Sequence, residues 1–365
     1  MAQQHSKASA VLAADRAHIA EIDAQIAELE ERIRLLRIDR EATQRRLDAY
    51  TYPVLTLPPE LVSEIFLHTL PAYPACPPLT GPASPISLTH ICQSWREVAI
   101  ATPLLWRAIA FICAEQDLGG QTEVVRTWLD RSGSCPLSVK IETEPGLVGN
   151  REEIPLYRER WEQVAIAATG HMLGFLLRDS MPMLRSLSVT MEYEGSRPAM
   201  ISLDLPSLRT VSLNWFQYPV NWLPWNQVTS LTLESMYSRN CIPVLRDAIH
   251  LEDLTLINCD FFDIANESRI PLTQLKTLVA TWNVVEILHL ITVPALQTLE
   301  LSGAELGEDP TGTLASLISR SSIKLQKLRI CGRYRLPVPM ETFLGAFPMI
   351  PDIVFMDESG SDFSE

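Results

Sequence analysis

Histidine and cysteine are the residues of this chain that could hold a metal ion or supply a nucleophile. The sequence has 7 histidines and 7 cysteines, but it contains no CxxC and no HExxH. His90 and Cys92 come closest to a ligand pair, and no second pair lies nearby to complete a tetrahedral site. His250 precedes Leu251 at an expected helix-to-strand turn, where a hydrogen-bonded structural role is the simpler interpretation. We therefore expect no metal and no cofactor.

The remaining sequence features also argue against catalysis. The chain has no GxSxG, no P-loop and no GxGxxG. Its cysteines are odd in number and far apart, a usage typical of a reducing compartment, and this predicts the cytoplasm, the nucleus or both. A net charge of −14 without a Lys/Arg-rich block disfavours nucleic acid and anionic lipid. No apolar run reaches the roughly 18 residues that span a bilayer, so we predict a non-enzymatic chain that binds other proteins.

The N-terminal part of the chain predicts one long helix over residues 12–50, preceded by a disordered segment at residues 1–11. Residues 12–50 contain neither Gly nor Pro. Their apolar residues alternate at spacings of three and four, which is the heptad pattern of a coiled coil. These seam residues are Leu12, Ile19, Ile22, Ile26, Leu29, Ile33, Leu36 and Leu47.

The partner and the orientation of this helix stay open at the level of sequence. Arg40 and Thr43 occupy seam positions, so the seam weakens toward its C-terminal end. In a parallel dimer Arg32 would face Arg37 of the other copy, which is repulsive. Residues 12–48 can therefore self-associate, bind another helical partner, or lie on the main body as a single amphipathic helix.

A short stretch, LPPELVSEIF at residues 57–66, has a strong helix-start signal. Proline suits the first helical position because its fixed φ matches the helix there. The apolar residues Leu61, Ile65 and Phe66 form a stripe that a small helical unit cannot fully cover. We therefore predict that this helix binds another protein.

This helix belongs to a predicted helical unit at residues 54–110. Apolar helical patterns cover residues 58–70 and 86–100, and a third short pattern follows Pro103. The loop between the first two patterns, residues 71–85, contains seven Pro or Gly residues and cannot form a helix or an interior strand.

The C-terminal half of the chain repeats one short phrase. Its copies are LRSLSVT, LRTVSLN, VTSLTLE, LEDLTLI, LKTLVAT, LQTLELS and LQKLRIC, starting at residues 184, 208, 228, 251, 275, 296 and 325, with a frayed copy at residue 350. The LxxLxL phrase at a period of 20 to 29 residues is typical of leucine-rich repeats. We predict an α/β fold, a leucine-rich-repeat solenoid (horseshoe) over residues 111–355, and an acidic disordered tail at residues 356–365.

Residues that alternate with the repeat leucines are expected on the concave face of the sheet. This face is the candidate surface for an unknown protein substrate, because Trp and Arg are preferred interface anchors. The alternative is that Ser and Thr are simply good exposed strand residues and that the tryptophans close the core. The candidate residues are Ser188, Ser212, Asn214, Trp215, Thr232, Glu234, Thr255, Trp282, Glu300 and Arg329.

The helical unit resembles an F-box, and the likeness covers roughly residues 55–110. It joins LPPELVSEIF to LTHICQSWREVAIATPLLWRAI at residues 88–109. WLDRSGSCPLSVKI, at residues 128–141, also resembles a junction found in many mushroom-type fungal F-box proteins. The matching positions of the F-box are Leu57, Pro58, Glu60, Leu61, Ile65, Phe66, Cys92, Trp95, Val98, Leu105 and Trp106.

The resemblance implies the substrate-recognition subunit of an SCF-type (Skp–cullin–F-box) E3 ubiquitin ligase. Such a subunit docks onto a Skp-type adaptor of the cullin complex, the repeats choose the substrate, and other subunits do the chemistry. The loop at residues 71–85 is longer than the family's usual link. The alternative is a non-catalytic leucine-rich-repeat scaffold without a role in ubiquitin transfer. The implied adaptor-binding residues are Leu57, Pro58, Glu60, Leu61, Ile65, Phe66, Trp95 and Trp106.

Overall fold

The computed structural model assigns the chain to two compact units, Met1–Val62 and Ser63–Glu365. The structure describes residues 2–50, 53–113, 120–143, 154–192, 203–262, 264, 266–332 and 339–356. Residues 357–365, most of the predicted acidic tail, lie outside these ranges.

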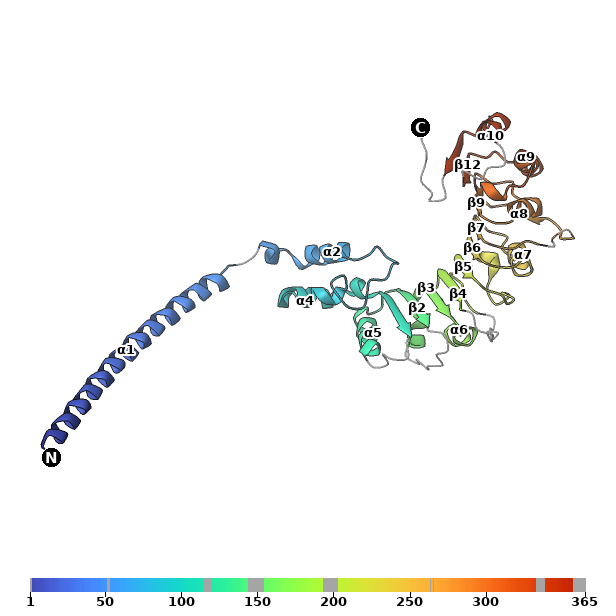
Figure 1. The fold of residues 1–365 in the computed structure, drawn as a ribbon. Coiled ribbons are helices and arrows are strands. Elements are labelled where there is room, and N and C mark those ends of the chain that lie inside the picture. Colours follow the sequence, from blue (N-terminus) through green and yellow to red (C-terminus); the bar gives the residue numbers. More distant parts are fainter. Residues whose placement is uncertain are drawn as a thin grey trace. The chain divides into compact units, whose positions relative to one another are not determined.

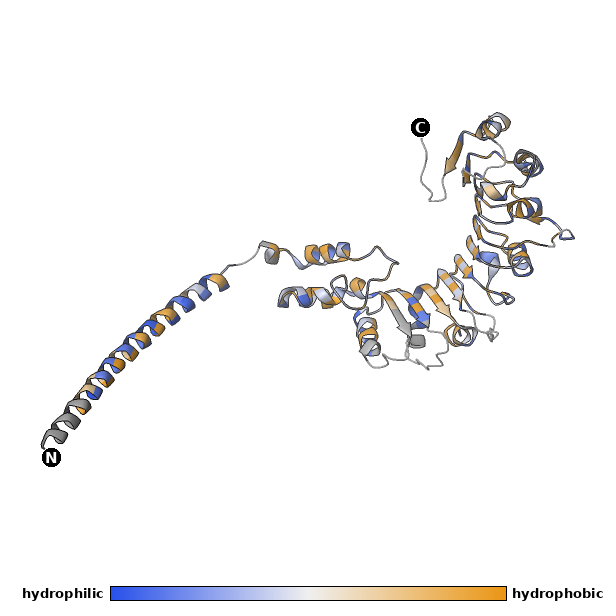
Figure 2. Ribbon diagram, viewed as in Figure 1, coloured by the Kyte–Doolittle hydropathy of each residue, from blue (hydrophilic) through white to orange (hydrophobic). Residues whose placement is uncertain are grey.

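The first unit is dominated by α1 (Ala2–Asp48), one uninterrupted helix of 47 residues (Figure 1). A short 3₁₀ turn, η1 (Pro53–Thr56), follows it. The helix begins at Ala2, within the segment 1–11 for which disorder was predicted. These residues include several alanines and neither Gly nor Pro, which favours helix propagation. Apolar and polar residues alternate along α1 in Figure 2.

The helices within residues 54–110 are short. They are α2 (Pro59–Thr69), α3 (Pro85–Leu88), α4 (Gln93–Ile100) and the 3₁₀ turn η2 (Pro103–Trp106). The single helix predicted over residues 86–100 is therefore two helices. The break lies at Thr89, whose hydroxyl donates to the carbonyl of Ile86 (2.6 Å), while Arg96 Nε donates to the carbonyl of Thr89 (2.7 Å). These bonds satisfy the last turn of α3 locally and let the chain turn into α4.

The second unit contains an 11-stranded sheet in which every described pair is parallel. Each strand lies beside the strand that precedes it in the sheet's chain order, so the sheet grows by one strand per repeat. This architecture is consistent with a leucine-rich-repeat-like solenoid. The strands are β1 (Ala108–Cys113), β2 (Leu137–Thr143), β3 (Trp161–Ala168), β4 (Ser186–Met191), β5 (Thr210–Asn214), β6 (Ser230–Glu234), β7 (Asp253–Ile257), β9 (Thr277–Ala280), β11 (Thr298–Ser302), β12 (Lys327–Cys331) and β13 (Asp352–Met356).

The repeat leucines form continuous buried rows across this sheet. Leu231 pairs in register with Leu254, which in turn pairs with Leu278, and all three are buried. The intervening residues of the strands are partly exposed. A strand cannot bury its apolar face alone, so each repeat depends on its neighbours. The predicted strand at every LxxLxL copy, and the alternation within it, is confirmed.

Three strands precede the first LxxLxL phrase. β1, β2 and β3 join the same sheet, although their sequences lack the repeat signature. β1 begins at Ala108, inside the helical unit predicted for residues 54–110. That boundary is corrected to the end of η2, because Ala108 and Ile109 are buried and pair with Ser138 and Val139 of β2.

The connections between strands carry helices along one side of the array, and the strands line the other side (Figure 1). These helices are α5 (Gly120–Arg131), α6 (Gly170–Leu176), α7 (Ser238–Asp247), α8 (Val284–Leu290), α9 (Pro310–Ser321) and α10 (Met340–Ala346). The 3₁₀ turns η3 (Ile154–Arg160), η4 (Trp225–Gln227) and η5 (Gly303–Glu305), and a small parallel pair of β8 (Ile270–Pro271) with β10 (Ile291–Thr292), complete the described elements. In the described part of the chain, no helix has the length and apolarity to cross a membrane.

Candidate protein-binding surfaces

The start of α2 is built by its prolines. The carbonyl of Pro58 accepts hydrogen bonds from the amides of Leu61 (3.0 Å) and Val62 (3.1 Å), and Pro59 is the first helical residue. Glu60 lies in the first turn, where a carboxylate interacts favourably with the helix dipole. These features fix where the helix begins and which face each later residue occupies.

The two faces of α2 differ. Leu61 and Ile65, four residues apart and so on the same side of the helix, are 53% and 44% exposed. Phe66 is fully buried. Of the remaining predicted adaptor contacts in this stretch, Leu57 is half-buried and Pro58 and Glu60 are exposed. The large apolar side chains that α2 leaves exposed are therefore Leu61 and Ile65.

Two of the predicted adaptor contacts belong to the core instead. The rings of Phe66 and Trp95 meet edge to face, with centroids 5.0 Å apart. Trp106 has no exposed surface, and its Nε1 donates to the carbonyl of Ala99 (2.8 Å). The Phe66 and Trp106 side chains thus hold the helices together, and a partner cannot touch them while the unit stays folded. Trp95 is partly buried and supports Phe66 from α4.

Trp106 also connects the helices to the start of the sheet. Its ring meets Trp128 of α5 edge to face at 5.5 Å, and the guanidinium of Arg131 lies 4.5 Å from its centroid. Burial lowers the pKa of Arg131 from its ordinary value, although the group stays charged at neutral pH. The buried Leu105–Trp106 pair therefore has a structural role, because Trp106 packs η2 against α5.

The long loop at residues 71–85 packs on the first strands. The hydroxyl of Tyr73 donates to Oε2 of Glu162 in β3 (2.8 Å), and the Ser138 hydroxyl of β2 donates to the carbonyl of Pro74 (2.6 Å). The Arg107 guanidinium lies 3.8 Å from the centre of the Tyr73 ring. Burial and the carboxylate of Glu162 raise the pKa of Tyr73 far above its ordinary value. The extra length of this loop thus ties the helices to the sheet.

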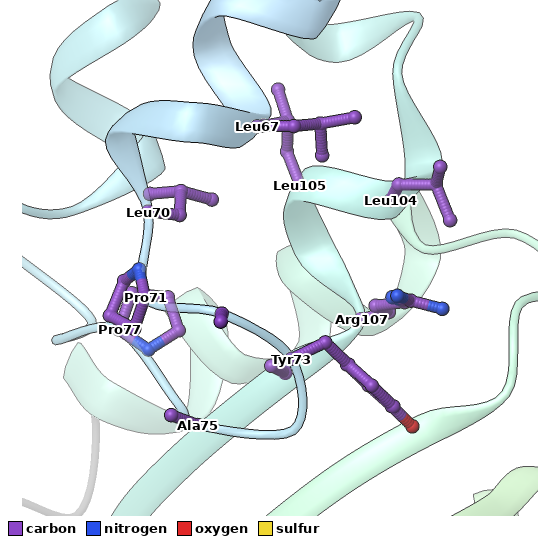
Figure 3. Close-up of a pocket in the computed structure, with 11 residues that line it drawn as sticks. Leu67, Leu70, Pro71, Tyr73, Ala75, Pro77, Leu104, Leu105 and Arg107 are labelled. Carbon is purple, nitrogen blue, oxygen red and sulfur yellow. The ribbon is translucent and has the colours of Figure 1, made fainter.

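Beside this loop lies a hollow of about 190 Å³, drawn in Figure 3. Leu67 and Leu70 line it from the end of α2, Leu104 and Leu105 from η2, and Pro71 and Pro77 from the loop. Its charged lining residue, Arg107, stacks on Tyr73. An apolar lining of this kind can seat an apolar side chain, but it brings together no acid–base or nucleophilic pair.

On the sheet, the structure gathers most of the predicted substrate-binding residues into two adjacent rows. We call the strand residues that alternate with the buried leucines the open face. Its rows run across the strands, and the second row contains Asn214 and Glu234, which pair in register. Asn214, Glu234 and all members of the first row are partly exposed. The first row runs through Ser188, Ser212, Thr232, Thr255, Val279, Glu300 and Arg329 in register.

The end of the open face carries an interacting trio. Nη1 of Arg329 lies 3.4 Å from Oε2 of Glu300, and Sγ of Cys331 lies 3.7 Å from Oε1 of the same carboxylate. Burial and the Glu300 carboxylate raise the pKa of Cys331 to about 11. The thiol is thus protonated at neutral pH and is a poor nucleophile.

Exposed aromatic residues follow four strands of the sheet. Trp215, after β5, is 51% exposed and Trp282, after β9, is 44% exposed. The interpretation that these tryptophans close the core is therefore wrong. Tyr237 after β6 and Phe262 after β7 are also exposed, and sequence reasoning missed both because they lie in loops without a period. Because the strands are parallel, all four residues belong to the edge where the strands end, and we call them the aromatic edge.

Trp215 is held there by an unusual backbone. Its φ is +57°, in the left-handed region that a bulky residue rarely adopts, and Ser235 and Asn258 at the ends of β6 and β7 share it with φ of +54° and +50°. The Trp215 amide donates to the carbonyl of Glu234 (3.0 Å), and the Ser235 amide to that of Ile257 (2.8 Å). This ladder fixes the strained turn, and such strain is typical of functional positions.

Within the described residues, no group of three or more His, Cys, Asp or Glu side chains could hold a metal ion. No protein-family model matches the chain, and no curated protein matches it either. The argument for function therefore rests on the surfaces described above.

Proposed function

We propose that the chain is the substrate-recognition subunit of an SCF-type E3 ubiquitin ligase, an F-box helical unit followed by a leucine-rich-repeat horseshoe. The observation that carries the proposal is α2, a proline-started helix whose Phe66 is buried while Leu61 and Ile65 stay exposed. Leu61 and Ile65 lie one turn apart on this helix, so a partner can cover both with one apolar surface.

The proposed adaptor contact consists of the exposed face of α2. Burying one Leu or Ile side chain contributes about 1.5–3 kcal/mol, so Leu61 and Ile65 together can anchor a docked partner. On the buried side of α2, the Phe66 ring packs edge to face on Trp95 of α4. Leu57 and Pro58 act at the helix start, and Glu60 on its polar side.

The proposed substrate surface combines the open face with the aromatic edge. Trp and Tyr are preferred hot-spot residues because they bury a large area at little entropic cost. Glu234 is the last residue of β6 and so lies beside this edge. Carboxylates and exposed indoles both attract cations, so a substrate segment bearing Lys or Arg suits this surface.

Affinity purification with mass spectrometry, using the tagged full-length chain in cells of its own source, tests both surfaces together. The proposal expects a Skp-type adaptor and a cullin among the captured proteins, from cytoplasm or nucleus. A Trp215→Ala/Trp282→Ala variant should keep the adaptor and lose substrates. Capture of proteins without any adaptor would favour the alternative function, a scaffold with no role in ubiquitin transfer.

A further inference from the structure

The apolar seam of α1 lies in solvent along its described length. Every seam residue from Leu12 to Leu47 is exposed. Most of the stability of a protein helix comes from packing an apolar face, so this seam needs a partner. In heptad terms, position a holds Leu12, Ile19, Ile26, Ile33, Arg40 and Leu47, and position d holds Asp15, Ile22, Leu29, Leu36 and Thr43.

A parallel, in-register pair of α1 helices brings like charges together. Arg40 at position a would meet Arg40 of the second copy, and Asp15 at position d would meet its own counterpart. At the flanks, Arg32 at position g would face Arg37 at position e. Unpaired like charges in a seam are costly, and flanking charges set the orientation of a coiled coil.

An antiparallel pair removes these conflicts. In antiparallel coiled coils, position e faces e and position g faces g. If Ile33 packs on Leu36 of the second copy, Glu30 faces Arg37 and Arg32 faces Asp39, and two-fold symmetry makes each pair twice. Sliding one helix by seven residues in either direction instead sets Glu30 against Glu30 or Arg37 against Arg37.

The seam is also compatible with this register. Its central layers are aliphatic, and Arg40 can lay its methylene stem along Leu29 while its charged head reaches water. The layers pair Ile33 with Leu36, Leu29 with Arg40, Ile26 with Thr43 and Ile22 with Leu47.

The ion pairs within the described part of α1 involve residues other than Glu30, Arg32, Arg37 and Asp39. These four flanking charges can therefore pair with a second chain. Glu31 pairs with Arg34 (2.7 Å) and Glu41 with Arg45 (3.5 Å). These four residues occupy positions b and f, on the side away from the seam.

From the exposed seam and this charge pattern, we propose that α1 forms an antiparallel two-helix coiled coil with a second copy of this chain, centred on the layer of Ile33 and Leu36. In this pair Asp48 of one copy lies beside Glu21 of the other. At 1.5 Å per residue, the two chains leave the coiled coil about 40 Å apart, at opposite ends. A dimer of this kind presents two copies of every downstream surface and binds multivalent targets with avidity.

Sedimentation of the full-length chain with charge reversals tests the orientation. The wild type should sediment as a dimer. Arg37→Glu and Glu30→Arg each turn two attractive pairs into repulsive ones and should raise the dimer dissociation constant about tenfold. The double variant Glu30→Arg/Arg37→Glu should restore it. In a parallel pair Arg37→Glu would relieve the repulsion from Arg32, so a tighter Arg37→Glu dimer overturns the proposal.

Two further variants keep the test independent of helix formation. Ile26→Lys/Leu29→Lys places charges in the seam and should give a monomer. Ile38→Lys, at position f, changes an exposed apolar residue of the same helix and should leave the dimer intact. Circular dichroism should show helical content in every variant. A wild-type monomer at all concentrations, or equal loss of association in Ile38→Lys, would overturn the proposal.

Discussion

Two regions of this molecule carry regularly spaced apolar residues and use them differently. In the sheet, Leu254 is fully buried, whereas Leu29 of α1 is 59% exposed. Leu254 is covered because the next repeats place Leu231 and Leu278 beside it in register. A single helix cannot cover its own apolar seam. The spacing of apolar residues therefore predicts which face needs to be buried. Whether that face is buried within the same chain depends on whether adjacent repeats lie beside it.

α2 carries a buried and an exposed apolar residue side by side, so it offers the largest expected difference in stability between two substitutions. Phe66→Ala should lower the free energy of unfolding by about 3–5 kcal/mol, because a buried ring leaves a cavity. Ile65→Ala, one residue earlier on the exposed side, should change it by no more than about 0.5 kcal/mol. Urea denaturation followed by tryptophan fluorescence measures both. Similar losses would mean that the two faces of α2 are wrongly assigned.

In the repeat sheet, Leu254→Ala should cost about 2–5 kcal/mol, the range for a buried leucine. Thr255→Ala, on the open face of the same strand, should cost little. The matched substitution Leu29→Ala in α1 should leave the unfolding of the sheet unchanged, because Leu29 is exposed and belongs to the other compact unit. Denaturant titration of the three variants measures their free energies of unfolding. Equal losses for Leu254→Ala and Thr255→Ala would mean that the strand register is wrong.

The α9 cap gives a smaller effect within the solenoid. Asp309 Oδ1 accepts a hydrogen bond from the Gly312 amide (2.9 Å) at the N-terminus of this helix. Asp309→Ala should cost about 1 kcal/mol, and Asp309→Asn, which keeps an oxygen acceptor, much less. Thermal melting of both variants provides the measurement, and identical melting temperatures would exclude a capping role.

The smallest effect concerns reactivity. Since the Glu300 carboxylate raises the pKa of Cys331, Glu300→Gln should lower that pKa, increase the thiolate fraction at pH 9 and speed alkylation of Cys331 by iodoacetamide. Peptide mass spectrometry follows the rate, with Glu286→Gln on α8 as the control. An unchanged rate would show that burial alone sets this pKa.

The sequence predicted the parts of this molecule that repeat. Each LxxLxL copy forms a strand, because two leucines on one face require the neighbouring copy. β1, β2 and β3 were not singled out, since their burial comes from packing beside the array and not from a repeated phrase. The break between α3 and α4 was also missed, because it depends on hydrogen bonds of Thr89 and Arg96 that interrupt an otherwise helical pattern.

For the candidate surfaces, residue type was predicted better than position. The helix period predicted one apolar stripe of Leu61, Ile65 and Phe66. It could not show that Phe66 packs on Trp95 and is buried while the other two stay exposed. The long loop packs on the sheet through a hydrogen bond between Tyr73 and Glu162, which are distant in sequence. No local sequence pattern predicts this contact. Tyr237 and Phe262 joined Trp215 and Trp282 only once the parallel strands placed their ends at one edge.

The most direct test of the proposed function is a titration of the purified full-length chain with a purified Skp-type adaptor from the same source. The account predicts that the wild type binds and that Leu57→Ala/Pro58→Ala, which loosens the helix start, binds more weakly. Ile65→Asp should bind at least about a hundredfold more weakly, because an unpaired charge would meet an apolar partner. Thermal melting and circular dichroism of the variants should match the wild type. A folded wild-type chain that ignores the adaptor, or an Ile65→Asp variant that binds it as the wild type does, would contradict the account.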